Sequence, residues 1–191
     1  MRTRLFIALT VTVALSLVGG SPASASVSSP YGIDDVVGVN TPKGDIVALQ
    51  VALTRTRVTF NLSLRRGIDV LNAHEWDQYS ATEIRIAMDT HDGGAVDYRF
   101  QMEGDSGGLA ADLTSFPGNN PVSCMVAVTQ PEGLRTIRVR FPRSCLTLDN
   151  PSEMRARVAY AFDQHSDGTV DTTDLAPDAG FTPQIRFPEP S

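Results

Sequence analysis

The residues best suited to chemistry form an acidic loop near the carboxyl end of the chain, from Asp163 to Asp174. Calcium loops of twelve residues place oxygen ligands at alternating positions and a glycine at the sixth, where the backbone turns sharply. Here aspartates stand at positions 1, 5, 9 and 12, and Gly168 stands at position 6. The expected calcium ligands are Asp163, Asp167, Thr169, Asp171 and Asp174. The alternative is an exposed turn whose carboxylates are solvated by water.

The same stretch resembles the calcium loop of dockerin modules, including the aspartate at position 12. The resemblance covers twelve residues and implies a calcium loop, with calcium as the cofactor, but not a whole dockerin. A dockerin has a helix before its loop, whereas Met154–Phe162 has the alternation of a strand. Position 3 is His165, which is a poor calcium ligand.

A second stretch, residues 89–97, repeats the first nine positions of this loop. The matching residues are Asp89, His91, Gly94, Val96 and Asp97 in the first stretch and Asp163, His165, Gly168, Val170 and Asp171 in the second. If both loops lie at one end of the fold, two imidazoles join the carboxylates around one ion, and imidazole favours zinc or another transition metal. A metal-assisted hydrolase is therefore one alternative function. Two unrelated turns are the other interpretation.

A third motif is Gly104-Asp105-Ser106-Gly107-Gly108, which matches the nucleophile motif of chymotrypsin-like serine proteases. That chemistry needs a histidine base and a buried aspartate beside the serine. In those proteases the histidine lies far upstream, but His74 and His91 lie shortly before Ser106. We therefore interpret the motif as a glycine-rich hairpin turn, and we identify no catalytic constellation in the chain.

The single tryptophan, Trp76, lies close to Tyr79 among several polar residues. Sugar-binding proteins use such rings as stacking platforms, because one face of a pyranose is apolar while its edge needs hydrogen bonds. Trp76 and Tyr79 are therefore the expected ligand-binding residues. The alternative is a tryptophan that seals one end of the fold.

These residues are placed by segments in which apolar and polar residues alternate with a period of two. The alternating segments are 58–64, 84–88, 96–102, 137–141 and 154–162, and further strands are expected near 46–53, 108–114, 122–129 and 183–187. Such alternation is typical of antiparallel sheets with one buried face. The sequence predicts an all-β, jelly-roll-like antiparallel β-sandwich of about nine or ten strands, with a closed barrel as the alternative.

The first 25 residues have the pattern of a secretory signal peptide. Arg2 and Arg4 precede an apolar run, Leu5–Val18, and Ala23-Ser24-Ala25 offers a cleavage site. We expect a single secreted domain, residues 26–191, that has no membrane segment after cleavage. Outside the cell the only two cysteines, Cys124 and Cys145, are predicted to form a disulfide.

Charge narrows the choice of partners. The chain carries a formal net charge of −6, and removal of a leader with two arginines and no acid changes this to −8. An acidic protein repels nucleic acid and anionic membranes, so neither is an expected partner. The arginines at outward strand positions are interpreted as solvated surface residues, with a specific anion-binding role as the alternative. We expect a monomer.

Two further resemblances bear on the fold. The stretch from Asp89 to Phe100 is similar to the strand, Asp-rich turn and Asp-Tyr of DOMON-like and family 9 carbohydrate-binding modules. Those are β-sandwiches that bind sugars, haem or calcium. The chain also resembles uncharacterised small secreted proteins of high-GC Gram-positive bacteria, a likeness carried by Asp34–Gly38, Asp45-Ile46 and Pro142–Leu146.

Taken together, these patterns favour a secreted, non-catalytic binding module for an extracellular carbohydrate, supported by a calcium ion in one loop. The sugar follows from analogy of fold. One alternative is the metal-assisted hydrolase with His91 and His165. Another is a cell-surface or cell-wall interaction protein without a small ligand.

Overall fold

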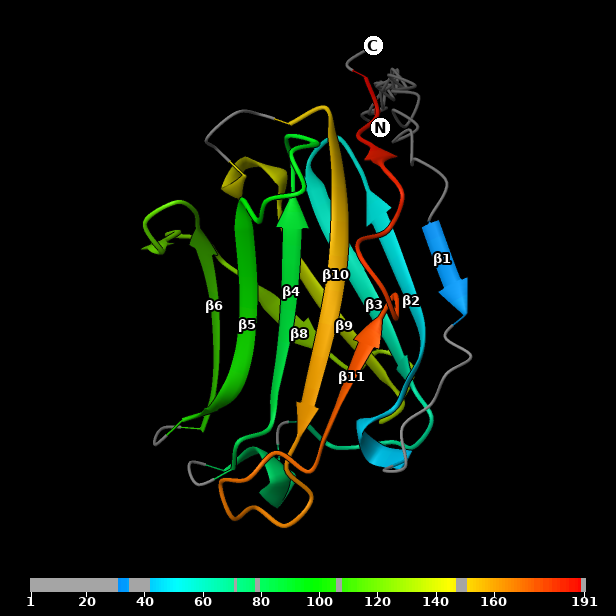
Figure 1. Ribbon diagram of the computed structural model, residues 1–191, viewed down its shortest axis with the longest axis vertical. Helices are drawn as coiled ribbons and strands as arrows, with labels where there is room; N and C mark the ends of the chain where they lie inside the picture. Colours follow the sequence, from blue (N-terminus) through cyan, green and yellow to red (C-terminus); the bar gives the residue numbers. More distant parts are fainter. Residues whose placement is uncertain are drawn as a thin grey trace, which may run out of the picture.

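The chain folds as a sandwich of two antiparallel β-sheets (Figure 1). The computed structural model describes residues 31–34, 42–70, 72–77, 80–105, 108–146 and 151–189. The expected signal peptide, residues 1–25, lies outside the described residues. No helix in the described ranges is long and apolar enough to cross a bilayer.

Five strands form the first sheet, here sheet A, in the order β1-β2-β3-β9-β8. They are β1 (Tyr31–Asp34), β2 (Ile46–Leu53), β3 (Arg57–Leu64), β8 (Ala127–Thr129) and β9 (Thr136–Pro142). Sheet B has the order β11-β10-β4-β5-β6-β7, and β12 adds to β10. Its strands are β4 (Glu83–Asp89), β5 (Tyr98–Asp105), β6 (Gly108–Ser115), β7 (Asn120–Pro121), β10 (Glu153–Phe162), β11 (Thr172–Ala176) and β12 (Ile185–Arg186).

The core lies between the sheets and follows from the alternation in the sequence. In β3 the four apolar residues Val58, Phe60, Leu62 and Leu64 are buried, while the residues between them face outwards. Strands β4, β5, β9 and β10 repeat the pattern, so one row of side chains from each enters the core. The predicted antiparallel sandwich is therefore confirmed.

The strand count and bounds differ from expectation in three places. Nine of the strands have four or more residues, and β7, β8 and β12 have only two or three. The strand expected at 122–129 is limited to 127–129. Residues 172–174, expected to end the acidic loop, are instead the first part of β11, and β1 was not predicted from the sequence.

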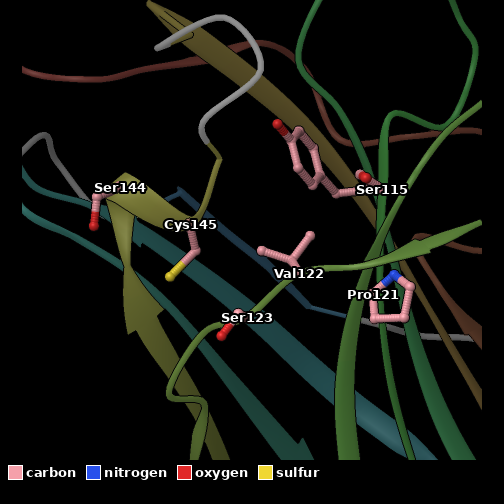
Figure 2. Close-up of a pocket in the computed structure, with 7 residues that line it drawn as sticks. Ser115, Pro121, Val122, Ser123, Ser144 and Cys145 are labelled. Atoms are coloured by element: carbon pink, nitrogen blue, oxygen red, sulfur yellow. The ribbon is translucent and has the colours of Figure 1, made fainter.

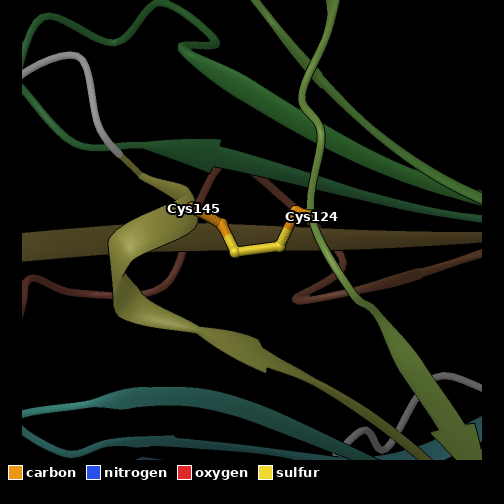
Figure 3. The surroundings of a disulfide bond; sticks show 2 residues. All are labelled: Cys124 and Cys145. Atoms are coloured by element: carbon orange, nitrogen blue, oxygen red, sulfur yellow. A yellow bond between two sulfur atoms is a disulfide. The ribbon is translucent and has the colours of Figure 1, made fainter.

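The chain crosses between the sheets three times, and one disulfide joins two of these crossings (Figure 3). Cys124 lies between β7 and β8, where the chain passes from sheet B to sheet A. Cys145 lies in the 3-10 turn η3 (Arg143–Cys145), from which the chain returns to sheet B. Their Cα atoms are 5.8 Å apart. The predicted disulfide is thus confirmed.

Candidate functional site

The acidic loop after β10 closes around one buried carboxylate, that of Asp163. Its Oδ1 accepts hydrogen bonds from the backbone N–H groups of His165 and Asp167, at 3.2 and 3.3 Å. Its Oδ2 accepts from Ala81 and Gly168, at 3.0 and 2.8 Å. Four donors match the roughly four lone-pair sites of a carboxylate. Burial raises the pKa of Asp163, but these bonds outweigh it and hold the pKa below its ordinary value.

The loop after β4 is built in the same way around Asp89, which is also buried. Its Oδ1 accepts from the backbone N–H of His91 at 3.1 Å, and its Oδ2 from Gly94 at 2.9 Å. Here a cation is also present, because the guanidinium of Arg155 binds Asp89 directly and lies 3.2 Å from Asp92. Burial raises the pKa of Asp89, and Arg155 with the backbone donors lowers it below its ordinary value.

The two loops also match at their far ends. The second aspartate, Asp97 or Asp171, accepts a hydrogen bond at 2.6 Å from the backbone N–H of the residue after the first aspartate. The histidine ring also contacts it, with Nδ1 at 3.0 Å in the first loop and 3.2 Å in the second. Gly94 and Gly168 have φ values of 73° and 82°, where a side chain is strained. The sequence repeat therefore encodes one loop conformation used twice.

These loops lie at opposite ends of sheet B (Figure 1). Strands β4 and β10 are antiparallel neighbours, with Asp89 across from Arg155 and Glu83 across from Ala161. Each loop follows the end of its own strand, and the seven residue pairs between the two ends span six steps, or about 20 Å. His91 and His165 therefore cannot bind one ion, and the hydrolase alternative loses the shared site that it required.

The expected calcium ligands are divided between two environments. Asp174 does not belong to the loop: it lies in β11, and its buried Oδ2 accepts from the backbone N–H of Ile46 at 2.7 Å. Asp167, Thr169 and Asp171 are exposed. In the described part of the chain no three His, Cys, Asp or Glu side chains gather closely enough to hold a metal ion. Calcium binding by this loop stays a prediction.

Trp76 is not a surface platform, contrary to the sequence-based expectation. It lies in the 3-10 turn η2 (His74–Trp76), only 4% of its surface is exposed, and its ring stacks on Tyr160 with centroids 6.1 Å apart. Both faces of the indole are covered, so Trp76 seals one end of the sandwich. Tyr79 lies outside the described residues.

The Gly-Asp-Ser-Gly-Gly motif joins β5 to β6, which pair antiparallel up to Asp105 and Gly108. This is the predicted hairpin, and residues 106–107 at its tip lie outside the described residues. Gly104 has a packing role: a Cβ there would lie 2.3 Å from the carbonyl oxygen of Trp76. The motif thus contributes close packing at the end of the sandwich.

A pocket that sequence reasoning did not find gathers three of the outward arginines on the outer face of sheet B. This shallow pocket of about 250 Å³ is lined by Arg85, Ala87, Arg99, Arg157, Ala159 and Leu175. These residues come from the four adjacent strands β5, β4, β10 and β11. The sequence signal was present, because outward arginines alternate with outward alanines, but only the register brings them together.

A second pocket, of about 310 Å³, lies beside the disulfide, between β7 and η3 (Figure 2). Ser115, Ser123 and Ser144 offer hydroxyl groups there. The rest of the lining is Tyr98, Pro121, Val122 and Cys145. The described residues that line it include no charged side chain. This pocket offers hydroxyl groups but no charge for selecting a ligand.

No known family profile matches the chain, and no curated protein matches it either. The fold and the geometry of the sites are therefore the basis for the functional argument.

Proposed function

We propose that the protein is a secreted, non-catalytic binding module that binds an extracellular carbohydrate on the outer face of sheet B. The observation that carries the proposal is the pocket of Arg85, Arg99 and Arg157 over Ala87 and Ala159. Binding sites of this kind combine an apolar surface with a few polar groups that fix orientation.

The lining of the pocket matches the two-sided chemistry of a sugar ring. The methyl groups of Ala87 and Ala159 and the side chain of Leu175 offer an apolar surface for a pyranose face. Each guanidinium has five N–H donors, which can bind the oxygen atoms at the ring edge. The alanines matter because larger outward side chains at these positions would fill the hollow.

Secretion is supported by two features. The leader pattern at residues 1–25 is typical of export, and the Cys124–Cys145 disulfide is typical of an oxidising compartment. The full chain expressed in a secreting host is expected in the medium, with Ser26 as the first residue after cleavage. N-terminal sequencing of the purified protein checks this.

A calcium ion in the loop after β10 remains part of the proposal. In the matching loop after β4, Asp89 binds the guanidinium of Arg155 from β10, whereas Asp171 of the second loop lies beside the imidazole of His165. Millimolar calcium is expected to raise the Tm of the wild type. The double variant Asp167→Ala/Asp171→Ala is expected to lose this rise, and an unchanged rise would contradict the assignment.

Binding is tested with the secreted protein by affinity electrophoresis and calorimetry on a panel of neutral and acidic polysaccharides. Ala87→Trp places an indole on the floor of the pocket and is expected to abolish binding. Ala52→Trp is the matched control, because Ala52 occupies an outward position in β2 of sheet A. Absence of binding to any member of the panel, or equal binding by both variants, would refute the proposed site.

A further inference from the structure

We infer that the pocket on the outer face of sheet B is an oxyanion subsite, so the carbohydrate that it takes is an acidic one. This inference rests on the proposed function and names the ligand class of the same site. It follows from the register of three strands, from the charge balance around the pocket, and from the way arginine binds oxyanions.

Register places two guanidinium groups on either side of one small residue. Ala87 in the central strand β4 lies directly across from Arg157 in β10 and directly across from Arg99 in β5. Adjacent strands are about 4.8 Å apart, so the Cα atoms of these two arginines are about 10 Å apart. Arg85 is two residues before Ala87 on the same face and lies across from Ala159. Three cations therefore surround a hollow floored by methyl groups.

The charges in this pocket are only partly compensated within the protein, by Glu83, which interacts with Arg85 and Arg99. Arg85 is paired with Glu83 at 2.7 Å. Arg99 lies over the ring of Phe116, with its Cζ 4.8 Å from the ring centroid, which leaves the charge in place. Arg157 has a buried Nε without a hydrogen-bond partner, and no ion pair joins it to another of the described residues.

The neighbouring arginine on the same face shows the contrast. Arg155, two residues before Arg157 in β10, is bound by Asp89 and lies 3.2 Å from Asp92. The described residues lining the pocket include no acid. In a chain with a formal net charge of −6, three arginines gathered in one hollow form a local cationic site. A ligand with negative charge would supply the missing partner.

The shape of the arginine side chain specifies the ligand further. A guanidinium is planar and binds a carboxylate or a sulfate with two parallel hydrogen bonds, which a neutral hydroxyl cannot match. Leu175 and the alanines suit an apolar ring face beside the charged group. The chemistry shared by suitable ligands is thus an oxyanion attached to a sugar ring, either a carboxylate or a sulfate ester.

Calorimetry with paired polysaccharides tests this inference. Polygalacturonate is compared with its fully methyl-esterified form, which has the same rings without charge, and dextran sulfate is compared with dextran. Each charged member is expected to bind at least tenfold more tightly than its neutral partner, and more weakly as salt increases. Whichever charged polysaccharide binds more tightly shows whether the preferred oxyanion is a carboxylate or a sulfate ester. Equal affinity within both pairs would overturn the inference while leaving carbohydrate binding intact.

Two substitutions at Arg157 separate charge from geometry. Arg157→Gln is expected to lower the affinity for the charged polysaccharide at least tenfold. Arg157→Lys is expected to recover part of this loss, because lysine keeps the positive charge but lacks the planar guanidinium that donates two parallel hydrogen bonds. Arg57→Gln, at an exposed position in β3 of sheet A, is the matched control and is expected to leave the affinity unchanged. Equal affinities in Arg157→Gln and in the control would overturn the inference.

Titration with small anions distinguishes failure of this inference from failure of the proposed function. Sodium sulfate and sodium galacturonate are titrated against the wild type and Arg157→Gln, with the Tm as readout at constant ionic strength. A rise in Tm for the wild type alone, with no polysaccharide bound, would support the oxyanion subsite and refute carbohydrate binding. No rise with either anion, together with no preference for charged polysaccharides, would refute the subsite.

Discussion

Asp163 provides the sharpest test of how the acidic loops work. The substitution Asp163→Asn keeps the size of the side chain but replaces one carboxylate oxygen with an amide N–H₂ group. In the wild type the two oxygens accept four backbone hydrogen bonds in a buried position. The asparagine can accept at one oxygen only, so two of the four donors lose their partner.

The expected magnitude follows from these two lost bonds. A hydrogen bond to a charged group contributes about 1.5–3 kcal/mol, so Asp163→Asn is expected to lower the free energy of unfolding by about 3–6 kcal/mol. For a domain of this size each kcal/mol lowers the Tm by about 2–4 °C. The variant is therefore expected to melt roughly 6–24 °C below the wild type.

Urea unfolding followed by tryptophan fluorescence measures the effect, because Trp76 is the single tryptophan and is buried in the fold. Asp167→Asn is the control: Asp167 is exposed, and its side chain accepts one backbone hydrogen bond, from Thr169 at 2.9 Å. The control is expected to change the free energy of unfolding by about 0.5 kcal/mol or less. Equal stability of the two variants would refute the view that Asp163 closes the loop.

The same comparison has a defined pH dependence. Folding lowers the pKa of Asp163 from its ordinary value of 3.8, so its stabilising contribution is complete above that value. As the pH falls below 3.8 towards the folded pKa, the wild type loses this contribution and Asp163→Asn does not. The difference between their free energies of unfolding is thus expected to narrow in acid, and a constant difference would contradict the ionised carboxylate.

Three further predictions address other parts of the fold. Gly104→Ala is expected to lower the free energy of unfolding by about 1–3 kcal/mol, because its Cβ would lie 2.3 Å from a backbone oxygen atom. Gly93→Ala is the control, because no atom lies within 4 Å of a Cβ at that position. Equal Tm values for the two variants would contradict the prediction. The Cys124–Cys145 disulfide joins residues 21 positions apart, and its reduction is expected to lower the free energy of unfolding by about 3 kcal/mol. Urea unfolding measures this, and an unchanged midpoint after reduction would contradict the prediction. Asp174→Asn is expected to leave stability at neutral pH equal or higher, because burial raises the pKa of Asp174 and disfavours its charged form; a lower Tm would contradict that reasoning.

The strands with clear alternation were predictable because burial of one face imposes a period of two. Segments 58–64 and 154–162 show this in the sequence and are strands in the structure. Strand β11 was missed because Asp174 and its threonine neighbours match a calcium-loop template, and aspartate is uncommon in strands. Its place is explained by a contact distant in sequence, the hydrogen bond from Ile46 to Asp174.

The candidate sites were predictable only in part. The two matching loops were visible as a repeat around Asp89 and Asp163, because the glycine and aspartate positions determine the local turn. Whether Trp76 is a platform or a core residue depends on which strands cover it. The arginine pocket depends on register, since Arg99 and Arg157 are far apart in sequence and meet only across Ala87.

The paired loops also fix the alignment of strands β4 and β10. Asp89, at the end of β4, binds Arg155 near the start of β10, while Asp163, after β10, binds the backbone of Ala81 just before β4. Sliding one strand by two residues would break both contacts at once, so the strand pair is locked at its two ends against slippage. Ala87 lies between these locks. The alignment that places Arg157 beside it is therefore set by residues outside the pocket, and a variant that loosens either loop is expected to weaken ligand binding without touching the ligand.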